Sequence, residues 1–215
     1  AGMSTKLTVL ATGGTIAGIA GSAITPGYRS GEIGIEDYLE KVGGLGLEAD
    51  LSGKQIANID SADIGPMVWT PLHQAAQAAL ADPACQGVIV THGTDTLEET
   101  AFLLDQTLPA DKPVVVVGAM RPADAVGYDG LRNFANAVRV ASDPDAAGRG
   151  VLVVMGDRIF AARDVYKVRT RGTEAFRGFP RESVGLVTPA SLEWFGAPWR
   201  TGAGAAFGWP ESFPG

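Results

Sequence analysis

Short apolar, β-branched stretches alternate along the chain with segments that have the apolar spacing of helices. A polar or glycine-rich turn follows each apolar stretch. Continuous apolar strands separated by helices are typical of a parallel sheet that is buried on both faces. We therefore expect an α/β fold, with a mostly parallel sheet and helices on both faces. The expected strands are residues 7–11, 55–59, 88–90, 114–117 and 151–155, with a further candidate at 183–188. The expected helices are residues 35–42, 70–81, 97–106 and 128–141.

Two of the expected helices carry local signals in their first turns. Pro71 suits the first turn of helix 70–81, because proline lacks the N–H that a helix start leaves unpaired. Glu98 and Glu99 make the first turn of helix 97–106 acidic, which the helix dipole favours.

The turns after the expected strands hold most of the candidate chemistry. Because the carboxyl ends of parallel strands share one edge, these turns should surround one crevice, and open α/β sheets bind their ligands there. The alternative is that turns between strands and helices are simply polar. The five turns are residues 13–15, 60–63, 92–95, 118–121 and 156–157.

The turn after the first strand ends in a threonine, Thr15. A threonine hydroxyl is a weak nucleophile and needs an activating partner. Gly13 and Gly14 allow close backbone approach and leave amides free to donate. Tyr28 lies in a segment rich in Gly, Ser, Thr and Pro, which can fold over a site as a lid. A phosphate-binding turn is the alternative, although the glycine spacing does not fit the dinucleotide fingerprint.

The turn after the third strand holds Thr94 and Asp95. Its carboxylate could orient water, bind a substrate ammonium or anchor a lysine, and Lys167 follows the fifth strand and can return to the same edge. A desolvated lysine next to a threonine hydroxyl can assist proton transfer, while a solvent-facing lysine is the alternative. Ser61 ends the second strand and suits a small carboxylate, or else caps the approach to the next helix.

Composition narrows the classes of function. The net charge of −7 and the lack of a basic run argue against nucleic-acid binding. No stretch has the ~18 apolar residues of a membrane helix. One cysteine and two histidines, without helical pair spacing, give no metal site, so His73 and His92 are expected to be structural or solvent-facing. The first strand begins almost at once, leaving no room for a signal peptide. We expect a cytoplasmic protein, with a secreted protein that has lost its leader as the alternative.

Two turns and three further segments resemble the bacterial-type L-asparaginases. The likeness runs from about residue 6 to about residue 190, and the paired threonine turns are highly specific. The two turns are LATGGTIAG (10–18) and THGTDTLEET (91–100), and the other segments are VGAMRP (117–122), GVLVVM (150–155) and RDVYK (163–167).

The resemblance implies hydrolysis of the side-chain amide of L-asparagine to L-aspartate and ammonia, with L-glutamine left open as a second substrate. It implies that Thr15 is the nucleophile and Tyr28 its partner in the lid. It also implies a second triad of Thr94, Asp95 and Lys167, which supports nucleophile activation and water attack.

The same resemblance implies a set of substrate contacts. Ser61 would hold the α-carboxylate and Asp95 the α-ammonium of the amino acid. The carbonyl of Ala119 would meet the side-chain amide. The backbone amides of Gly14 and Thr94 would form the oxyanion hole, which is often the largest single catalytic contribution.

Three features differ from the family's usual pattern. Family members usually carry a second, smaller C-terminal domain, whose glutamate completes the site of a neighbouring subunit, and no residue here takes that role. Ala62 follows Ser61 where the family often has a polar residue. The tail is rich in aromatics, glycine and proline. We expect residues 6–190 to form an asparaginase-like N-terminal domain. Residues 191–215 would be a tail that packs on this domain or a neighbouring subunit, with no second domain.

These observations leave several hypotheses about function. The first is an amidohydrolase that works through an acyl-threonine intermediate. The alternative is a non-catalytic or weakly active amino-acid-binding module. A tRNA-dependent amidotransferase subunit is a third, against which the net acidity and the lack of an RNA-binding extension count. In each case we expect no cofactor, no membrane partner and no nucleic-acid partner. We also expect a homo-oligomer, since a shortened domain must cover the surface that its lost partner shields.

Overall fold

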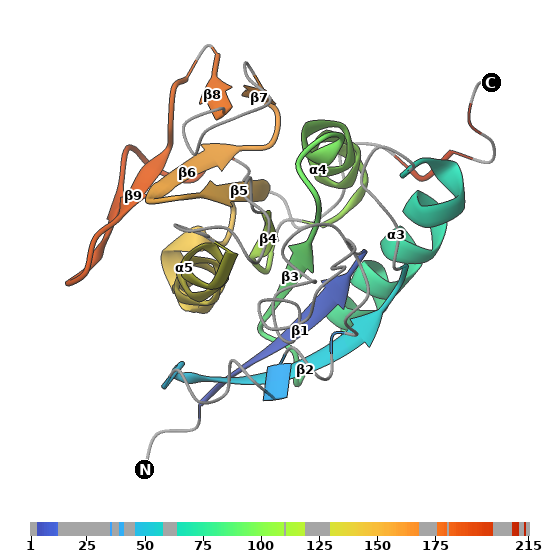
Figure 1. Ribbon diagram of the computed structural model, residues 1–215, viewed down its shortest axis with the longest axis horizontal. Coiled ribbons are helices and arrows are strands. Elements are labelled where there is room, and N and C mark those ends of the chain that lie inside the picture. The colour runs from blue at the N-terminus through green and yellow to red at the C-terminus, as the bar shows by residue number, and fades with distance from the viewer. Residues whose placement is uncertain are drawn as a thin grey trace, which may run out of the picture.

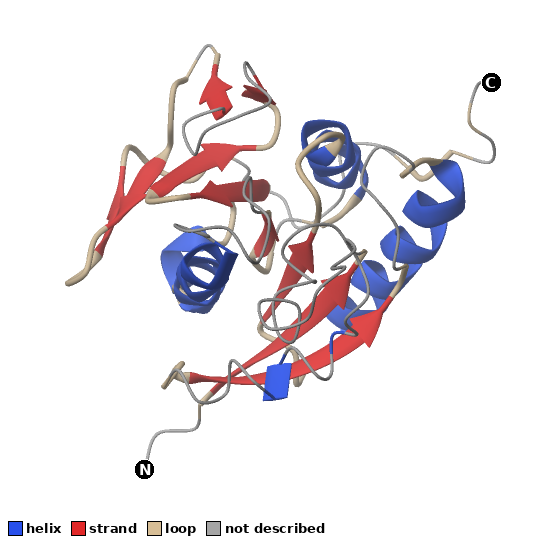
Figure 2. Ribbon diagram, viewed as in Figure 1, coloured by secondary structure: helices blue, strands red, loops and turns tan. Residues whose placement is uncertain are grey.

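The computed structural model describes residues 4–12, 35, 39–40, 46–57, 64–109, 111–118, 130–167, 176–179, 181–199, 208–210 and 213. Within them lie an eight-stranded sheet and a separate two-stranded sheet (Figures 1 and 2). The strands are β1 (Thr5–Ala11), β2 (Ala49–Gln55), β3 (Gly87–Thr91), β4 (Val114–Val117), β5 (Val151–Met155), β6 (Arg158–Ala161), β7 (Val165–Lys167), β8 (Phe176–Gly178), β9 (Gly185–Val187) and β10 (Leu192–Trp194). The helices are α3 (Pro66–Ala81), α4 (Leu97–Thr107), α5 (Gly130–Ser142) and the short 3-10 helix η3 (Pro144–Ala146).

The large sheet has the order β10-β9-β6-β5-β4-β3-β1-β2. Strands β1 to β5 run parallel, while β6, β9 and β10 add an antiparallel extension beyond β5. The chain goes from β1 outward to β2 and then returns to the other side of β1 with β3. This reversal makes the space between the carboxyl ends of β1 and β3 a topological switch point, where open α/β sheets bind ligands.

Helices cover both faces of the parallel strands (Figure 2). Phe134 of α5 packs on one face, together with Ile35. Leu72 of α3 and Leu104 of α4 pack on the other face. Because both faces are covered, every residue of β3, β4 and β5 is buried. The predicted α/β class, with a mostly parallel sheet and helices on both faces, is confirmed.

The second strand was expected at residues 55–59, and this boundary is wrong because the strand ends at Gln55. β2 is the edge of the sheet, and its side chains alternate between partly buried and exposed. Such a strand lacks the continuous apolar run that marks the central strands. The residues from 58 onward in the expected strand lie outside the described part of the chain.

The start of α3 also differs from the expectation. Pro66, not Pro71, occupies the first turn, and Pro71 lies inside the helix. The earlier start uses the proline that loses nothing at a helix start, while Pro71 costs the helix interior one backbone hydrogen bond. The acidic first turn of α4, with Glu98 and Glu99, is confirmed. In the expected helix 35–42, the described residues Ile35, Leu39 and Glu40 are helical.

β7 and β8 form an antiparallel hairpin that stands apart from the main sheet (Figure 1). Phe176 is 1 % exposed and anchors the hairpin in the core beneath α3 and α4. The buried carboxylate of Asp164 accepts a hydrogen bond from Arg181 at 3.1 Å, and its backbone carbonyl accepts one from the Phe179 amide at 2.9 Å. These contacts fix the base of the hairpin that carries Lys167.

The described part of the C-terminal tail lies against α3. The Trp209 ring stacks on His73 with 4.1 Å between centroids, and Phe213 lies 5.6 Å from Trp69. Packing on this domain was one of the two arrangements that the sequence left open. In the described part of the chain, no helix is both long and apolar enough to cross a membrane.

Candidate active site

The strands on either side of the switch point end at the same level. Ala11 of β1 pairs with Thr91 of β3, which in turn pairs with Val117 of β4. Beyond the strands, the Thr12 hydroxyl donates to the Thr91 carbonyl at 2.8 Å, and the His92 amide donates to the Val117 carbonyl at 2.9 Å. The turns that follow β1, β3 and β4 therefore begin side by side at one edge of the sheet.

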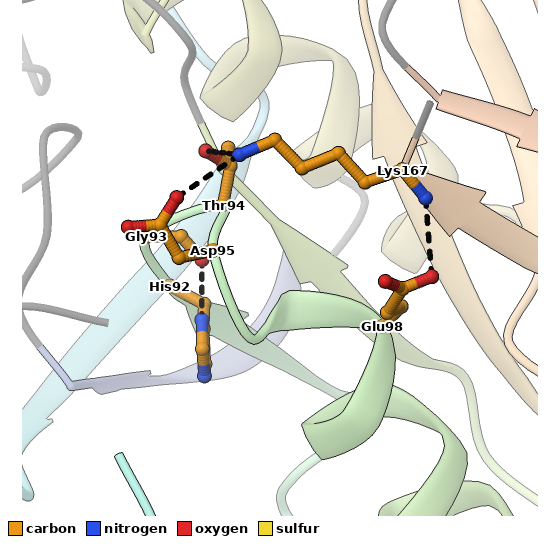
Figure 3. A network of polar contacts seen from close by, with 6 residues as sticks. All are labelled: His92, Gly93, Thr94, Asp95, Glu98 and Lys167. Carbon is orange, nitrogen blue, oxygen red and sulfur yellow. Dashed lines mark hydrogen bonds and ion pairs between the residues drawn. The ribbon is translucent and has the colours of Figure 1, made fainter. Parts of the chain in front are cut away.

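Thr94, Asp95 and Lys167 meet at this edge (Figure 3). The ammonium nitrogen of Lys167 lies 3.2 Å from the Thr94 hydroxyl oxygen and 3.0 Å from a carboxylate oxygen of Asp95. Thr94 and Asp95 follow β3, whereas Lys167 comes from the separate hairpin. The spatial grouping expected from the sequence is present, and it joins segments more than 70 positions apart.

The environment of this cluster is strongly asymmetric. The Lys167 side chain is 11 % exposed, whereas the Asp95 side chain is 61 % exposed. An ammonium can only donate, so the Thr94 oxygen accepts from Lys167, and its own hydrogen is directed elsewhere. The arrangement gives a shielded cation, a hydroxyl that can pass a proton, and a carboxylate open to a ligand from solvent.

A buried hydrogen-bonded chain supports the turn from below. The indole N–H of Trp69 donates to the Thr100 hydroxyl oxygen at 2.9 Å, and that hydroxyl lies 2.9 Å from Nε2 of His92. Nδ1 of His92 contacts the carbonyl of Gly93, which can only accept. Nδ1 therefore carries the proton, and Nε2 accepts the Thr100 hydrogen. His92 is completely buried, and burial lowers its pKa to about 4, with the bond to Gly93 opposing the shift.

The neutral state of His92 predicts a loss of stability in mild acid. Between pH 6.5 and pH 4 the unfolded chain protonates this histidine and the folded chain does not. The free energy of unfolding should therefore fall as the pH falls, by up to about 3 kcal/mol from this residue. Urea unfolding at a series of pH values, compared with His92→Gln, measures the effect. Stability curves that run parallel in the two proteins would contradict it, because His73 and Glu98 titrate in both.

A second buried polar residue ties two turns of the same edge together. Asn133 of α5 donates to the Gly118 carbonyl at 2.7 Å and accepts from the Gly156 amide at 2.8 Å. Gly118 passes so close to the next turn that a Cβ there would lie 2.7 Å from the His92 carbonyl oxygen. The backbone that leads into Ala119 is thus fixed against the β3 turn.

The remaining predicted site residues lie outside the described part of the chain. They are Gly14, Thr15, Tyr28, Ser61 and Ala119. Their roles stay predictions, as do the individual roles of Thr94, Asp95 and Lys167. Within the described ranges, no group of three or more His, Cys, Asp or Glu side chains has the arrangement of a metal site.

Sequence reasoning did not assign site roles to Glu98, Thr100, Trp69 or Asn133. Glu98 was interpreted only as an acid in a helix first turn, but its carboxylate accepts the backbone N–H of Lys167 at 3.1 Å. Glu98 does lie inside the THGTDTLEET segment, so its proximity to the site was available in the sequence. No local pattern could indicate the partner across the fold.

Comparisons with known proteins agree with this geometry. The family model described as "Asparaginase, N-terminal" matches residues 6–200. "L-asparaginase 2" of Bacillus subtilis (strain 168) is 44% identical over 183 residues, which cover 85% of this chain and 49% of that protein. "Probable L-asparaginase periplasmic" of Haemophilus influenzae is 41% identical, covering 90% of this chain and 55% of that protein. The chain belongs to the asparaginase family and corresponds to its N-terminal domain.

A solved structure shows the same fold. The probable cytoplasmic L-asparaginase of Campylobacter jejuni superposes with a TM-score of 0.82 at 35% identity, covering 95% of this chain and 61% of that one. The chain spans about half the length of the curated relatives it matches. The names of these relatives include both a periplasmic and a cytoplasmic protein, so the similarity does not decide between the two compartments.

Proposed function

We propose that this chain is an amidohydrolase that converts L-asparagine to L-aspartate and ammonia through a threonine nucleophile. The observation that carries the proposal is the contact of the shielded Lys167 ammonium with both Thr94 and Asp95. A metal-free hydrolysis of an unactivated amide needs an assisted nucleophile and a proton relay. The cluster supplies the second of these at the switch point of the sheet.

In the proposed reaction, the Thr15 hydroxyl oxygen attacks the side-chain amide carbon, with Tyr28 as its partner. The C–N bond then breaks, ammonia leaves with the proton from the nucleophile, and an aspartyl ester of Thr15 remains. Water, deprotonated through Thr94 and Lys167, attacks the ester carbon and releases aspartate. The Thr15 hydroxyl regains its proton, and Lys167 returns to its starting state.

The substrate contacts follow from the charges of a small zwitterion. The exposed carboxylate of Asp95 accepts the α-ammonium, Ser61 donates to the α-carboxylate, and the Ala119 carbonyl accepts from the amide N–H. Gly14 and Thr94 supply backbone amides to the oxyanion. The bond from His92 to the Gly93 carbonyl supports this role of Thr94. In a trans peptide the following N–H points away from that carbonyl, and hence away from His92.

A binding module without catalysis is the second candidate. It is favoured by one observation, that the chain covers 49% of the Bacillus subtilis relative and 55% of the Haemophilus influenzae relative. If the glutamate of the family's second domain is indispensable, the chain would bind the amino acid and turn over slowly or not at all. The division into residues 6–190 and 191–215 and the expected self-association also stay proposals.

The test is release of ammonia from L-asparagine by the purified chain, with L-glutamine as the second substrate. Thr94→Val should lower kcat by about 10²- to 10⁴-fold, because valine keeps the shape and removes the hydroxyl that relays the proton. Thr94→Ser keeps the hydroxyl and serves as the matched control. Calorimetric binding of aspartate without measurable turnover would support the binding module instead. Wild-type activity in Thr94→Val would exclude the proposed proton relay.

A further inference from the structure

Glu98 links the two segments that form the Lys167 cluster. It lies in the first turn of α4, four positions after Thr94. Its carboxylate oxygen Oε2 accepts the backbone N–H of Lys167 at 3.1 Å, on the side opposite to the Nζ contacts (Figure 3). Lys167 is therefore held both at its backbone and at the end of its side chain by residues of a single turn.

The hairpin alone does not determine where the Lys167 ammonium lies. β7 is three residues long, pairs only with β8 within the described residues, and stands apart from the large sheet. The lysine side chain is flexible and carries about 2 kcal/mol of rotamer entropy. A small shift of the β7 backbone relative to α4 would carry Nζ away from Thr94, because both hydrogen bonds depend on distance.

We propose that Glu98 is a positioning residue for Lys167, fixing the β7 backbone against the turn that carries Thr94 and Asp95. This inference rests on the proposed function of that turn. The carboxylate accepts a main-chain hydrogen bond, so it constrains the strand itself, whichever side chain the strand carries. Glu98 does not touch the substrate, and it acts through Lys167.

The electrostatic surroundings of Glu98 are consistent with a demanding position. Burial raises the pKa of Glu98, and the neighbouring Glu99 raises it further, while the Lys167 amide and ammonium oppose these effects. An acid needed only to complement the helix dipole could remain in solvent, as the exposed Glu99 of the same turn does. Glu98 instead gives up solvent for one backbone hydrogen bond.

The first experiment separates positioning from helix capping by steady-state kinetics. Glu98→Ala should lower kcat by about 10- to 100-fold with little change in KM, because displacement of the ammonium affects the chemical steps and leaves Asp95 available. Glu98→Gln keeps an acceptor oxygen and should recover most of kcat. Glu99→Ala removes an equivalent first-turn charge and should behave like the wild type.

The second experiment does not depend on activity. The chain has five lysines, so acetylation by acetic anhydride can be followed at each by peptide mass spectrometry. Lys112, exposed and bonded to the Asp82 carbonyl, is the internal reference. Glu98→Ala should raise the Lys167 to Lys112 rate ratio several-fold, while Glu98→Gln and Glu99→Ala should leave it unchanged. Thermal unfolding checks that each variant is folded.

The outcomes distinguish the two proposals. An inactive wild type with the expected labelling pattern would refute the proposed function and keep Glu98 as the residue that positions Lys167. Wild-type kcat and labelling in Glu98→Ala would overturn the role of Glu98. Equal losses in Glu98→Ala and Glu98→Gln would also overturn it, because glutamine retains the acceptor. A rise in KM alone would place Glu98 in substrate binding and contradict the proposal.

Discussion

Lys167→Met is expected to lower kcat for L-asparagine by about 10³-fold, within the range typical of lost acid–base assistance. Methionine has a similar length and shape, so packing around the 11 % exposed side chain is retained. The Thr94 hydroxyl and the Asp95 carboxylate both lose their shared donor. The hydroxyl then has no cation to assist its loss of a proton, and both acylation and deacylation slow.

The measurement is steady-state ammonia release together with the pH profile of kcat. Asp95 is exposed and can be hydrated after the substitution, so KM should change less than kcat. Lys112→Met is the matched control, since it removes an exposed ammonium that also makes a hydrogen bond. A kcat in Lys167→Met as high as in Lys112→Met would refute the proton relay and leave the cluster a structural one.

Thr15→Ala should lower kcat by about 10⁴-fold or more, because loss of a nucleophile removes the covalent pathway altogether. Thr15 lies outside the described residues, but the strand that leads to it is fixed. The Thr12 hydroxyl and amide both bond to the Thr91 carbonyl, three residues before Thr94. The chain therefore leaves β1 directly beside the turn that carries the Lys167 cluster.

Thr15→Ser retains the hydroxyl and is the control, with activity expected close to that of the wild type. Rapid acid quench followed by intact-mass spectrometry should detect one aspartyl group on the wild type during turnover and none on Thr15→Ala. An aspartyl ester that persists in Thr15→Ala would assign the nucleophile to another residue. Unchanged turnover in this variant would exclude covalent catalysis by Thr15.

Much of the fold could be predicted from local pattern. The central strands β3, β4 and β5 are continuous apolar runs, because helices cover both of their faces. The start of α4 follows from its acidic first turn. Local pattern failed at β2, whose edge position gives alternating exposure. It also failed at α3, where two prolines competed for one helix start.

The sequence by itself determined the class of fold and the residue types at the ends of the strands. Strand periodicity and turn chemistry act over a few neighbouring residues, so they can be recognised without coordinates. They identified Thr94 and Asp95 as a reactive turn and Lys167 as a candidate partner. The family resemblance, confirmed by the match over residues 6–200, also followed from these local segments.

Only the tertiary structure decided which of these groups meet. Lys167 reaches Thr94 across 73 positions because Phe176 and Asp164 fix the hairpin, and because Glu98 bonds to its backbone. The buried bonds of His92 and Asn133 are likewise long-range choices. Such pairings depend on strand order and on the packing of side chains distant in sequence. No short-range pattern contains that information.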